Sequence, residues 1–222
     1  MAAKVFLGRD IETQNHVAIK FLKKNYPGFC SERISEFKKE IGVLKDLDHQ
    51  GIVKMHDGGH DGSVVDTKHH AQYNIDYIVM DFEKYEMFDF CVDMGAMGEE
   101  AGKFFLHQLV DTMQYVHDNN ISHRDLKLDN MLIDDNLNTK VLDFGLAYKG
   151  NSGKLRNWVG TPSYMAPEIN EQKWYNGKEV DVFSLGVIIY SIVVGNFPFE
   201  RATAYDKFYK LIMNGEIEKF FD

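Results

Sequence analysis

The residues with the clearest potential for chemistry lie close together in the second half of the chain. They form the run His123-Arg124-Asp125-Leu126-Lys127-Leu128-Asp129-Asn130, which a short strand-like segment separates from Asp143-Phe144-Gly145. Phosphoryl transfer needs a carboxylate that accepts a proton from the attacking hydroxyl, a cation on the γ-phosphate and oxygen ligands for Mg²⁺. The residues that supply these groups are Asp125, Lys127, Asn130 and Asp143. An ordinary polar loop, the alternative, would need many specified positions to coincide by chance.

A second candidate part of such a site lies near the start of the chain. Lys20 ends the strand-like run Val17-Ala18-Ile19-Lys20, where a strand would hold its ammonium at a fixed point. Glu40 lies on a predicted helix, on the turn between Phe37 and Leu44, from which it can reach Lys20 as an ion pair. Taken singly, Lys20 is an exposed strand lysine and Glu40 is a solvated helix charge.

These segments together resemble the signature set of the protein kinase superfamily. The resemblance extends over nearly the whole chain, and it includes Ala166-Pro167-Glu168, which closes the activation segment, and Asp181 and Gly186. It implies transfer of the γ-phosphate of ATP to hydroxyl groups of proteins, with Mg²⁺ as the metal. The fold that it implies is α+β and two-lobed, with a small β-rich lobe that includes one helix and a larger helical lobe.

The resemblance also implies roles for individual residues. Lys20 resembles the lysine that anchors the phosphates, Glu40 its helix partner and Asp125 the catalytic base. Asn130 and Asp143 resemble the magnesium ligands. The residues implied around the nucleotide are Val5 and Ala18 above the adenine, Leu132 below it, the backbone of Asp81 and Glu83 at its edge, Met80 as gatekeeper and Glu86 near the ribose.

Two places in the sequence resemble serine/threonine kinases rather than tyrosine kinases. Lys127 follows the predicted base by two residues, and Gly160-Thr161-Pro162-Ser163-Tyr164 precedes Ala166. We expect Thr161 to contact Asp125 and Lys127, although a loop hydroxyl that caps a turn is the alternative. The activation segment looks closest to the calmodulin-dependent and related kinases. The competing interpretation is a catalytically silent kinase fold that serves as a scaffold or binding module.

The elements that must position these residues change character along the chain. Lys4–Phe21, Ile52–His56 and Tyr77–Phe82 have the patterns of strands, whereas 57–74, rich in Gly, His and Asp, is predicted as a surface insertion. Two apolar stripes predict helices, one formed by Ile34, Phe37, Ile41, Leu44 and Leu47, the other by Leu106, Leu109, Val110, Met113 and Val116. This order predicts a small lobe over 1–82, a large lobe over 83–222, and a site in the cleft between them.

Departures from the family pattern lead to two more expectations. The glycine-rich loop would precede Val5 and the last helices would follow the end of the chain, so we expect a domain truncated at both ends, with weakened ATP binding. Relatives that are switched on by phosphorylation often carry threonine four residues before Thr161, where this chain has Asn157. We therefore expect no need for a phosphate there, with Ser152 as the remaining candidate and Arg124 serving to position the loop.

Composition narrows the class of protein further. The net charge of −9 disfavours nucleic acids, and with Glu86 and Asp129 at the peptide groove it favours substrates that carry Arg or Lys before the acceptor. Two cysteines indicate neither a disulfide scaffold nor a four-cysteine zinc site. The chain starts without a signal-peptide pattern, and the apolar stretch Val182–Val194 is short for a bilayer. We expect a cytoplasmic protein without a membrane span, and the sequence leaves its oligomeric state open.

Overall fold

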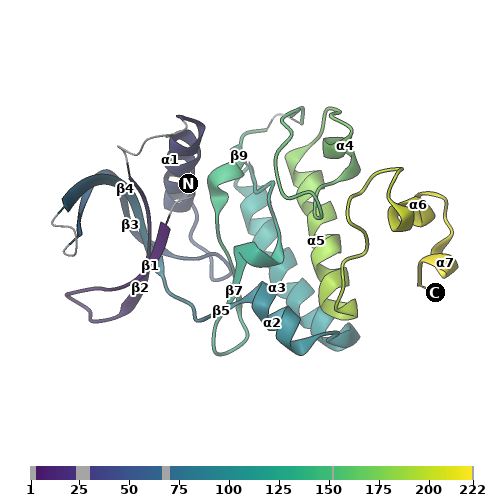
Figure 1. Cartoon of the computed structure of the whole chain (residues 1–222), viewed down its shortest axis with the longest axis horizontal. Coiled ribbons are helices and arrows are strands. Elements are labelled where there is room, and N and C mark those ends of the chain that lie inside the picture. Colours follow the sequence, from purple (N-terminus) through teal and green to yellow (C-terminus); the bar gives the residue numbers. More distant parts are fainter. Residues whose placement is uncertain (1–3, 24–30, 67–70, 152, 222) are drawn as a thin grey trace.

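The computed structural model describes residues 4–23, 31–66, 71–151 and 153–221. An antiparallel sheet with one helix forms the first part of the chain, and helices dominate the second part (Figure 1). This arrangement confirms the predicted α+β fold with a small sheet lobe and a larger helical lobe. The chain passes between the lobes after Asp81, where the last strand of the sheet ends. The exact domain boundary between residues 82 and 83 stays a prediction.

Short elements and the loops between them carry the candidate residues of the large lobe, and the long helices surround them. The small lobe contains strands β1 (Lys4–Arg9), β2 (His16–Lys23), β3 (Met55–Asp66) and β4 (Ala71–Asp81) and helix α1 (Ser31–Asp46). The helices of the large lobe are α2 (Met87–Met94), α3 (Gly98–Asp118), α4 (Pro167–Asn170), α5 (Gly177–Val194), α6 (Lys207–Met213) and α7 (Ile217–Phe221). The short elements are strands β5 (Tyr85–Glu86), β6 (Ile121–Ser122), β7 (Met131–Ile133), β8 (Thr139–Val141) and β9 (Tyr148–Lys149), and the 3₁₀ turns η1 (Leu128–Asn130) and η2 (Phe144–Leu146).

The sheet of the small lobe presents one face to the cleft. Its strand order is β1-β2-β4-β3, and all neighbouring strands are antiparallel. Ala18 and Lys20 of β2 lie opposite Met80 and Ile78 of β4. Successive side chains of a strand point to opposite faces. Ala18, Lys20 and Leu22 therefore share a face, and all three line the cleft.

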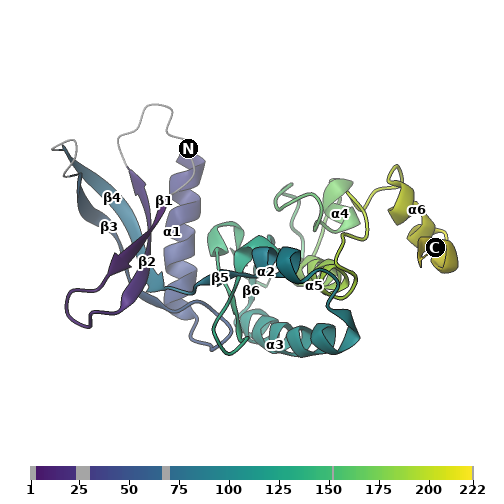
Figure 2. The ribbon, with the colours of Figure 1, turned by 60° about the horizontal axis from the view of Figure 1, so that its bottom comes forward.

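Helix α1 lies beside the sheet, where it contacts β3 and also the η2 turn of the large lobe (Figure 2). The predicted apolar stripe is confirmed, because Phe37, Ile41 and Leu44 are buried and Ile34 is partly buried. Glu40 lies on the same side of the helix and is only 3% exposed. Because burying a lone carboxylate is costly, this position requires a cationic partner.

The stretch 57–74 was wrongly predicted to be a surface insertion separate from the strands. Most of it belongs to β3 and β4, which are paired antiparallel. Ser63 lies opposite Asn74, and the pairing continues to Met55 opposite Met80. Position 62 requires glycine, because a Cβ on Gly62 would lie 2.4 Å from a ring carbon of Tyr77. Close approach across the strands therefore explains a composition that resembles a loop. Residues 67–70 lie outside the described residues.

Helix α3 packs against α5 in the large lobe (Figure 1). The prediction was right for Leu109, Met113 and Val116, which are buried, but wrong for Leu106 and Val110, which are 36% and 46% exposed. The buried residues of α3 are Gly102, Phe105, Leu109, Thr112, Met113 and Val116. The buried side of α3 thus includes Phe105 instead of Leu106 and Val110. Two adjacent apolar rows run along this helix, and the way α3 packs on its neighbours decides which row is buried.

Helix α5 includes the apolar stretch Val182–Val194 and supplies much of the core of the large lobe. Val187, Ile188 and Ile192 are buried, as predicted for a core helix, whereas Val182 is 60% exposed. Across the described ranges, no helix combines the length and the apolar character that a membrane crossing requires.

Candidate active site

A cleft of about 720 Å³ lies between the lobes and brings most of the predicted site residues together. The predicted residues that line it are Val5, Ala18, Lys20, Glu40, Met80, Asp81, Glu83, Glu86, Asp125, Leu132 and Asp143. The other three, Lys127, Asn130 and Thr161, do not line the cleft but surround Asp125. Residues from both lobes thus meet in one place.

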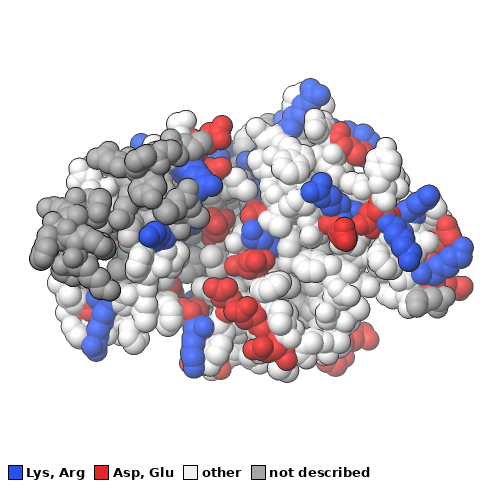
Figure 3. All heavy atoms as spheres, in the orientation of Figure 1, with Lys and Arg blue, Asp and Glu red and all other residues white. Residues whose placement is uncertain are grey.

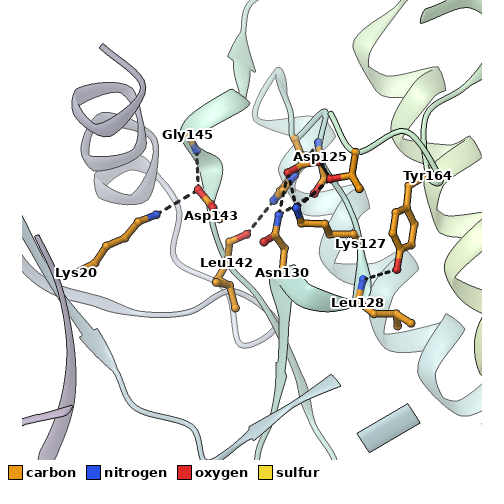
Figure 4. Close-up of polar contacts among 11 residues, drawn as sticks. Lys20, Asp125, Lys127, Leu128, Asn130, Leu142, Asp143, Gly145 and Tyr164 are labelled. Atoms are coloured by element: carbon orange, nitrogen blue, oxygen red, sulfur yellow. Dashed lines mark hydrogen bonds and ion pairs between the residues drawn. The ribbon is translucent and has the colours of Figure 1, made fainter. Parts of the chain in front are cut away.

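Lys20 connects the two lobes (Figure 4). Its Nζ donates to both carboxylate oxygens of Glu40 at 2.7 Å and to Oδ1 of Asp143 at 3.2 Å. The strand holds the lysine, α1 holds Glu40, and the turn at the start of η2 holds Asp143. The predicted ion pair between Lys20 and Glu40 is therefore present, and the same ammonium also contacts Asp143 of the large lobe.

Burial and charge shift the pKa values of all three groups. Burial raises the pKa of Glu40 to about 7, against the attraction of Lys20, and the nearby charge of Asp143 acts in the same direction as burial. Burial opposes the charged form of Lys20 as well, but the two carboxylates outweigh it and its pKa is raised. For Asp143, burial is outweighed by Lys20, so its pKa is lowered. Asp143 therefore stays ionised at neutral pH, and Glu40 titrates there.

We expect nucleotide affinity to depend on the protonation of Glu40. Between pH 8 and pH 6 this carboxyl passes through its pKa of about 7, and protonation removes the charge that holds Lys20. At pH 6, about one unit below this pKa, roughly 90% of the carboxyl is protonated, so wild-type affinity for the proposed nucleotide should fall by at most about tenfold. Glu40→Gln should bind ATP more weakly at pH 8 but lose this part of the pH dependence.

The measurement is the dissociation constant of a fluorescent ATP analogue at pH 6, 7 and 8. Because the phosphates of the nucleotide titrate identically with both proteins, the difference between wild type and Glu40→Gln isolates the carboxyl. Parallel pH profiles for the two proteins would contradict the assignment.

Asp125 lies in a closed set of polar contacts. Its Oδ1 accepts a hydrogen bond from the Thr161 hydroxyl at 2.8 Å, and Lys127 Nζ lies 3.2 Å from its Oδ2. Lys127 also donates to Thr161 Oγ1 at 2.9 Å, and Asn130 Nδ2 donates to the backbone oxygen of Asp125 at 2.9 Å. The expected contact of Thr161 with Asp125 and Lys127 is thus present. The carboxylate is held in one orientation, as a proton acceptor needs to be.

Gly160 allows Thr161 to approach the loop that carries Asp125. Its φ is +110°, and a Cβ at this position would lie 2.8 Å from the backbone oxygen of Arg124. A residue with a side chain would therefore be strained by its backbone and would also push the two segments apart. The glycine explains why this part of the activation segment closes onto the loop.

Asp181 of α5 anchors the loop from the buried side. Its Oδ1 accepts from the amide of Arg124 at 2.7 Å and its Oδ2 from the amide of His123 at 2.8 Å, while His117 Nε2 lies 2.9 Å from Oδ2. The side chain of Asp181 is fully buried. These bonds satisfy backbone donors of a loop in which Arg124 has the uncommon φ of +66°. Family resemblance pointed to Asp181, but not to these partners.

Several contacts that shape the site have no sequence signal. Lys140 of β8 lies 3.5 Å from Asp81 and 3.7 Å from Glu83, and His56 Nε2 lies 2.8 Å from the other oxygen of Asp81. Nε2 of His123 lies 3.0 Å from the backbone oxygen of Leu142. All these pairs are distant in sequence, so spacing along the chain could not reveal them.

The charge of the cleft indicates how a nucleotide could bind. Its acidic lining residues are Glu36, Glu40, Asp81, Glu83, Glu86, Asp125 and Asp143, and its basic ones are Lys20, Arg33 and Lys84. Acidic side chains accordingly gather where the lobes meet (Figure 3). Such a surface would repel a bare polyphosphate, and a divalent cation would reduce that repulsion.

Asn130 and Asp143 fit a magnesium ion. Asn130 uses its Nδ2 toward Asp125, and Asp143 uses its Oδ1 toward Lys20 and Gly145. Within the described part of the chain, Asn130 Oδ1 and Asp143 Oδ2 accept no hydrogen bond, and no cluster of three or more His, Cys, Asp or Glu ligands is formed. Mg²⁺ typically takes one or two protein oxygens and completes its shell with phosphates and water. One oxygen of Asn130 and one of Asp143, the latter residue in contact with Lys20, suit that pattern.

Comparisons with known proteins agree with this geometry. The family model described as protein kinase domain matches residues 1–221. The chain is 38% identical over 199 residues to the probable serine/threonine-protein kinase MARK-C of Dictyostelium discoideum, covering 89% of this chain and 24% of that protein. It is 37% identical over 198 residues to the SNF1-like protein kinase ssp2 of Schizosaccharomyces pombe, covering 89% of this chain and 32% of that protein. The chain thus spans about a quarter to a third of the length of these relatives.

Proposed function

The chain belongs to the protein kinase domain family, and we propose that the protein transfers the γ-phosphate of ATP to serine and threonine hydroxyls of other proteins. The observation that carries this proposal is the convergence of Lys20, Asp125 and Asp143 on one cleft, with Thr161 and Lys127 around Asp125. The relative from Dictyostelium discoideum, whose name describes a serine/threonine-protein kinase, supports the choice of acceptor.

Each side chain has a definite task in this proposal. Lys20, held by Glu40, binds and orients the phosphates of ATP, and Asp125 accepts the proton of the attacking hydroxyl. Nζ of Lys127 lies 3.2 Å from Asp125 and hence beside the reacting hydroxyl. In this proposal it compensates negative charge that builds up on the transferred group. Asn130 and Asp143 would hold Mg²⁺, and the ion supplies neutralisation of charge on the phosphate oxygens. Positioning and electrostatics thus supply the catalysis, without a covalent intermediate on the protein.

The apolar end of the cleft suits the adenine. Val5 and Ala18 from the sheet and Leu132 from β7 line it, and Met80 lies at the end of β4. We assign the edge of the base to the backbone of Asp81 and Glu83. Glu86, the last residue of β5 and the one before α2, then lies near the ribose. The residues that we propose for ATP binding are Val5, Ala18, Lys20, Glu40, Met80, Asp81, Glu83, Glu86, Leu132 and Asp143.

The proposed partners are proteins with serine or threonine acceptors. Glu86 lines the cleft and Asp129 is exposed beside the loop of Asp125, which favours peptides with Arg or Lys near the acceptor. The acidic net charge supports proteins over nucleic acids as partners. We place the protein in the cytoplasm as part of the same proposal.

The test is a phosphate-transfer assay with γ-labelled ATP and the complete protein. We expect label on a serine peptide with arginine before the acceptor, several-fold more slowly on a matched peptide with alanine there, and none on a tyrosine peptide. Because the cleft is acidic, chelation of Mg²⁺ should reduce transfer to background, and added Mg²⁺ should restore it. Transfer that is absent with both serine and threonine peptides, or that persists without divalent cations, would contradict the proposal.

A further inference from the structure

Arg124, the residue before the proposed base, carries a buried charge that neutral groups hold. Arg124 as a whole is only 9% exposed. The Nε donates to the backbone oxygen of Leu146 at 2.9 Å, Nη1 donates to the hydroxyl of Tyr175 at 3.2 Å, and the guanidinium lies 5.9 Å from the ring centre of Tyr148. In the described ranges, no carboxylate oxygen lies within 4 Å of this guanidinium. A buried cation held this way depends strongly on each of its acceptors.

Tyr175 connects this arginine with the activation segment. Its hydroxyl accepts from Arg124 and donates to the backbone oxygen of Asn157 at 2.9 Å. Its backbone exchanges two hydrogen bonds with Leu155, both 2.8 Å long. The residue is 3% exposed, so water does not replace these partners freely. One tyrosine therefore holds residues 155 and 157 of the segment and the loop of the proposed base at the same time.

The segment held by Tyr175 leads directly to the site. Four residues after Asn157 the chain reaches Thr161, whose hydroxyl donates to Asp125. Between them Gly160 lies against the backbone of Arg124. A shift of residues 155–157 would consequently reach the carboxylate of Asp125 through Thr161.

We infer that Tyr175 is a positioning residue that fixes the activation segment against the catalytic loop, so that no phosphate on this segment is required. The inference rests on the proposed function and adds its mode of regulation. In kinases that are switched by phosphorylation, the new phosphate orders this segment by pairing with arginine. Here the hydroxyl of Tyr175 occupies a donor of Arg124, and the residue whose carbonyl meets that hydroxyl is Asn157, which offers no hydroxyl to phosphorylate. Ser152, the other candidate in the segment, lies outside the described residues.

The opposing interpretation is that Arg124 binds a phosphate group once the activation segment is phosphorylated. Burial, and then the charge of Arg124, lower the pKa of Lys39, so two cations lie close together without full compensation. The Tyr175 hydroxyl already accepts from Nη1 of Arg124, so a phosphate would bind the remaining donors of the guanidinium. The two interpretations differ in what removal of phosphate does to the rate, and in what removal of the hydroxyl does to the segment.

The experiment compares wild type, Tyr175→Phe and the matched control Tyr205→Phe, a fully exposed tyrosine. The complete proteins are treated with phosphatase, and mass spectrometry verifies that they carry no phosphate. Amide hydrogen exchange is measured at Leu155 and Tyr175, and kcat and KM are measured with ATP and a serine peptide.

We expect phosphatase-treated wild type to keep its full rate. Tyr175→Phe should raise exchange at the Leu155 and Tyr175 amides about tenfold and lower kcat about tenfold, as expected for a lost buried bridge, with KM for ATP unchanged. Tyr205→Phe should match wild type in each measurement.

Two results would overturn the inference: wild type that loses activity with phosphatase and regains it on phosphorylation of the segment, or Tyr175→Phe with wild-type exchange and kcat. The exchange measurement needs no catalysis. A protein that transfers no phosphate in any state would therefore refute the proposed function, while the exchange at Leu155 and Tyr175 would still decide whether the bridge holds the segment.

Discussion

Asp125→Asn is expected to lower kcat for phosphate transfer by about 10³-fold, within the range for loss of a proton acceptor. The amide keeps the shape of the side chain and can still accept from Thr161, whose hydroxyl lies 2.8 Å from Oδ1. It cannot take up the proton of the substrate hydroxyl. Nucleotide affinity should stay within about twofold of wild type, because Lys20 and Asp143 are unchanged. The measurements are a single-turnover transfer rate and the dissociation constant of an ATP analogue.

The control for this prediction is Asp135→Asn, an exposed carboxylate in the turn after β7. It should transfer phosphate at the wild-type rate. This pair also separates the catalytic proposal from the alternative of a silent scaffold, because a scaffold gives the same background with Asp125→Asn as with wild type. Equal, ATP-dependent transfer by both proteins would place the proton acceptor elsewhere.

Asp181→Asn is expected to lower the free energy of unfolding by about 3 kcal/mol, as for a buried charge that loses its role in a hydrogen-bonded network. Both carboxylate oxygens accept backbone N–H groups, at 2.7 Å from Arg124 and 2.8 Å from His123. The amide of asparagine would turn its own donor toward one of them, leaving a buried N–H without an acceptor. Chemical denaturation monitored by circular dichroism gives the change.

The same substitution should also misplace the catalytic loop in molecules that remain folded. We expect kcat to fall by at least about tenfold at a temperature well below the unfolding midpoint, since small misplacements of a reacting group are costly. Asp135→Asn again serves as the control, with unchanged stability. A variant as stable as wild type would mean that the loop is held mainly by other contacts.

Residue type and spacing predicted the polar centre of the candidate site, whereas the residues around the adenine were predicted only from the family resemblance. Asp125, Asn130 and Asp143 lie in short runs whose order reflects one loop and one turn, so local sequence already places them near each other. The pair of Lys20 and Glu40 could also be predicted, because a strand lysine and the inward side of an amphipathic helix are both periodic features. The contacts between these residues are present in the structure, while their catalytic roles stay predictions.

Other features depend on packing that spacing does not encode. Asp181 lies 57 residues after Arg124, and Tyr175 lies 51 residues after it, so only the folded large lobe brings them to the loop. Leu106 was predicted to be buried because two apolar rows run along α3, and the sequence does not say which row α5 covers. The hairpin of β3 and β4 was missed because glycine and aspartate disfavour strands, whereas cross-strand packing on Tyr77 overrides that preference.

That hairpin has a consequence for the behaviour of the protein in concentrated solution. Strand β3 is at the end of the strand order, so it is an edge of the sheet, and it reaches Val65, which is 60% exposed. Long, straight edges recruit other chains and lead to aggregation. The pairing of β3 is interrupted between Met55 and Asp57 and again between Gly59 and Gly62. Such bulges bend an edge away from regular pairing, so these irregularities should limit association of β3 with other chains.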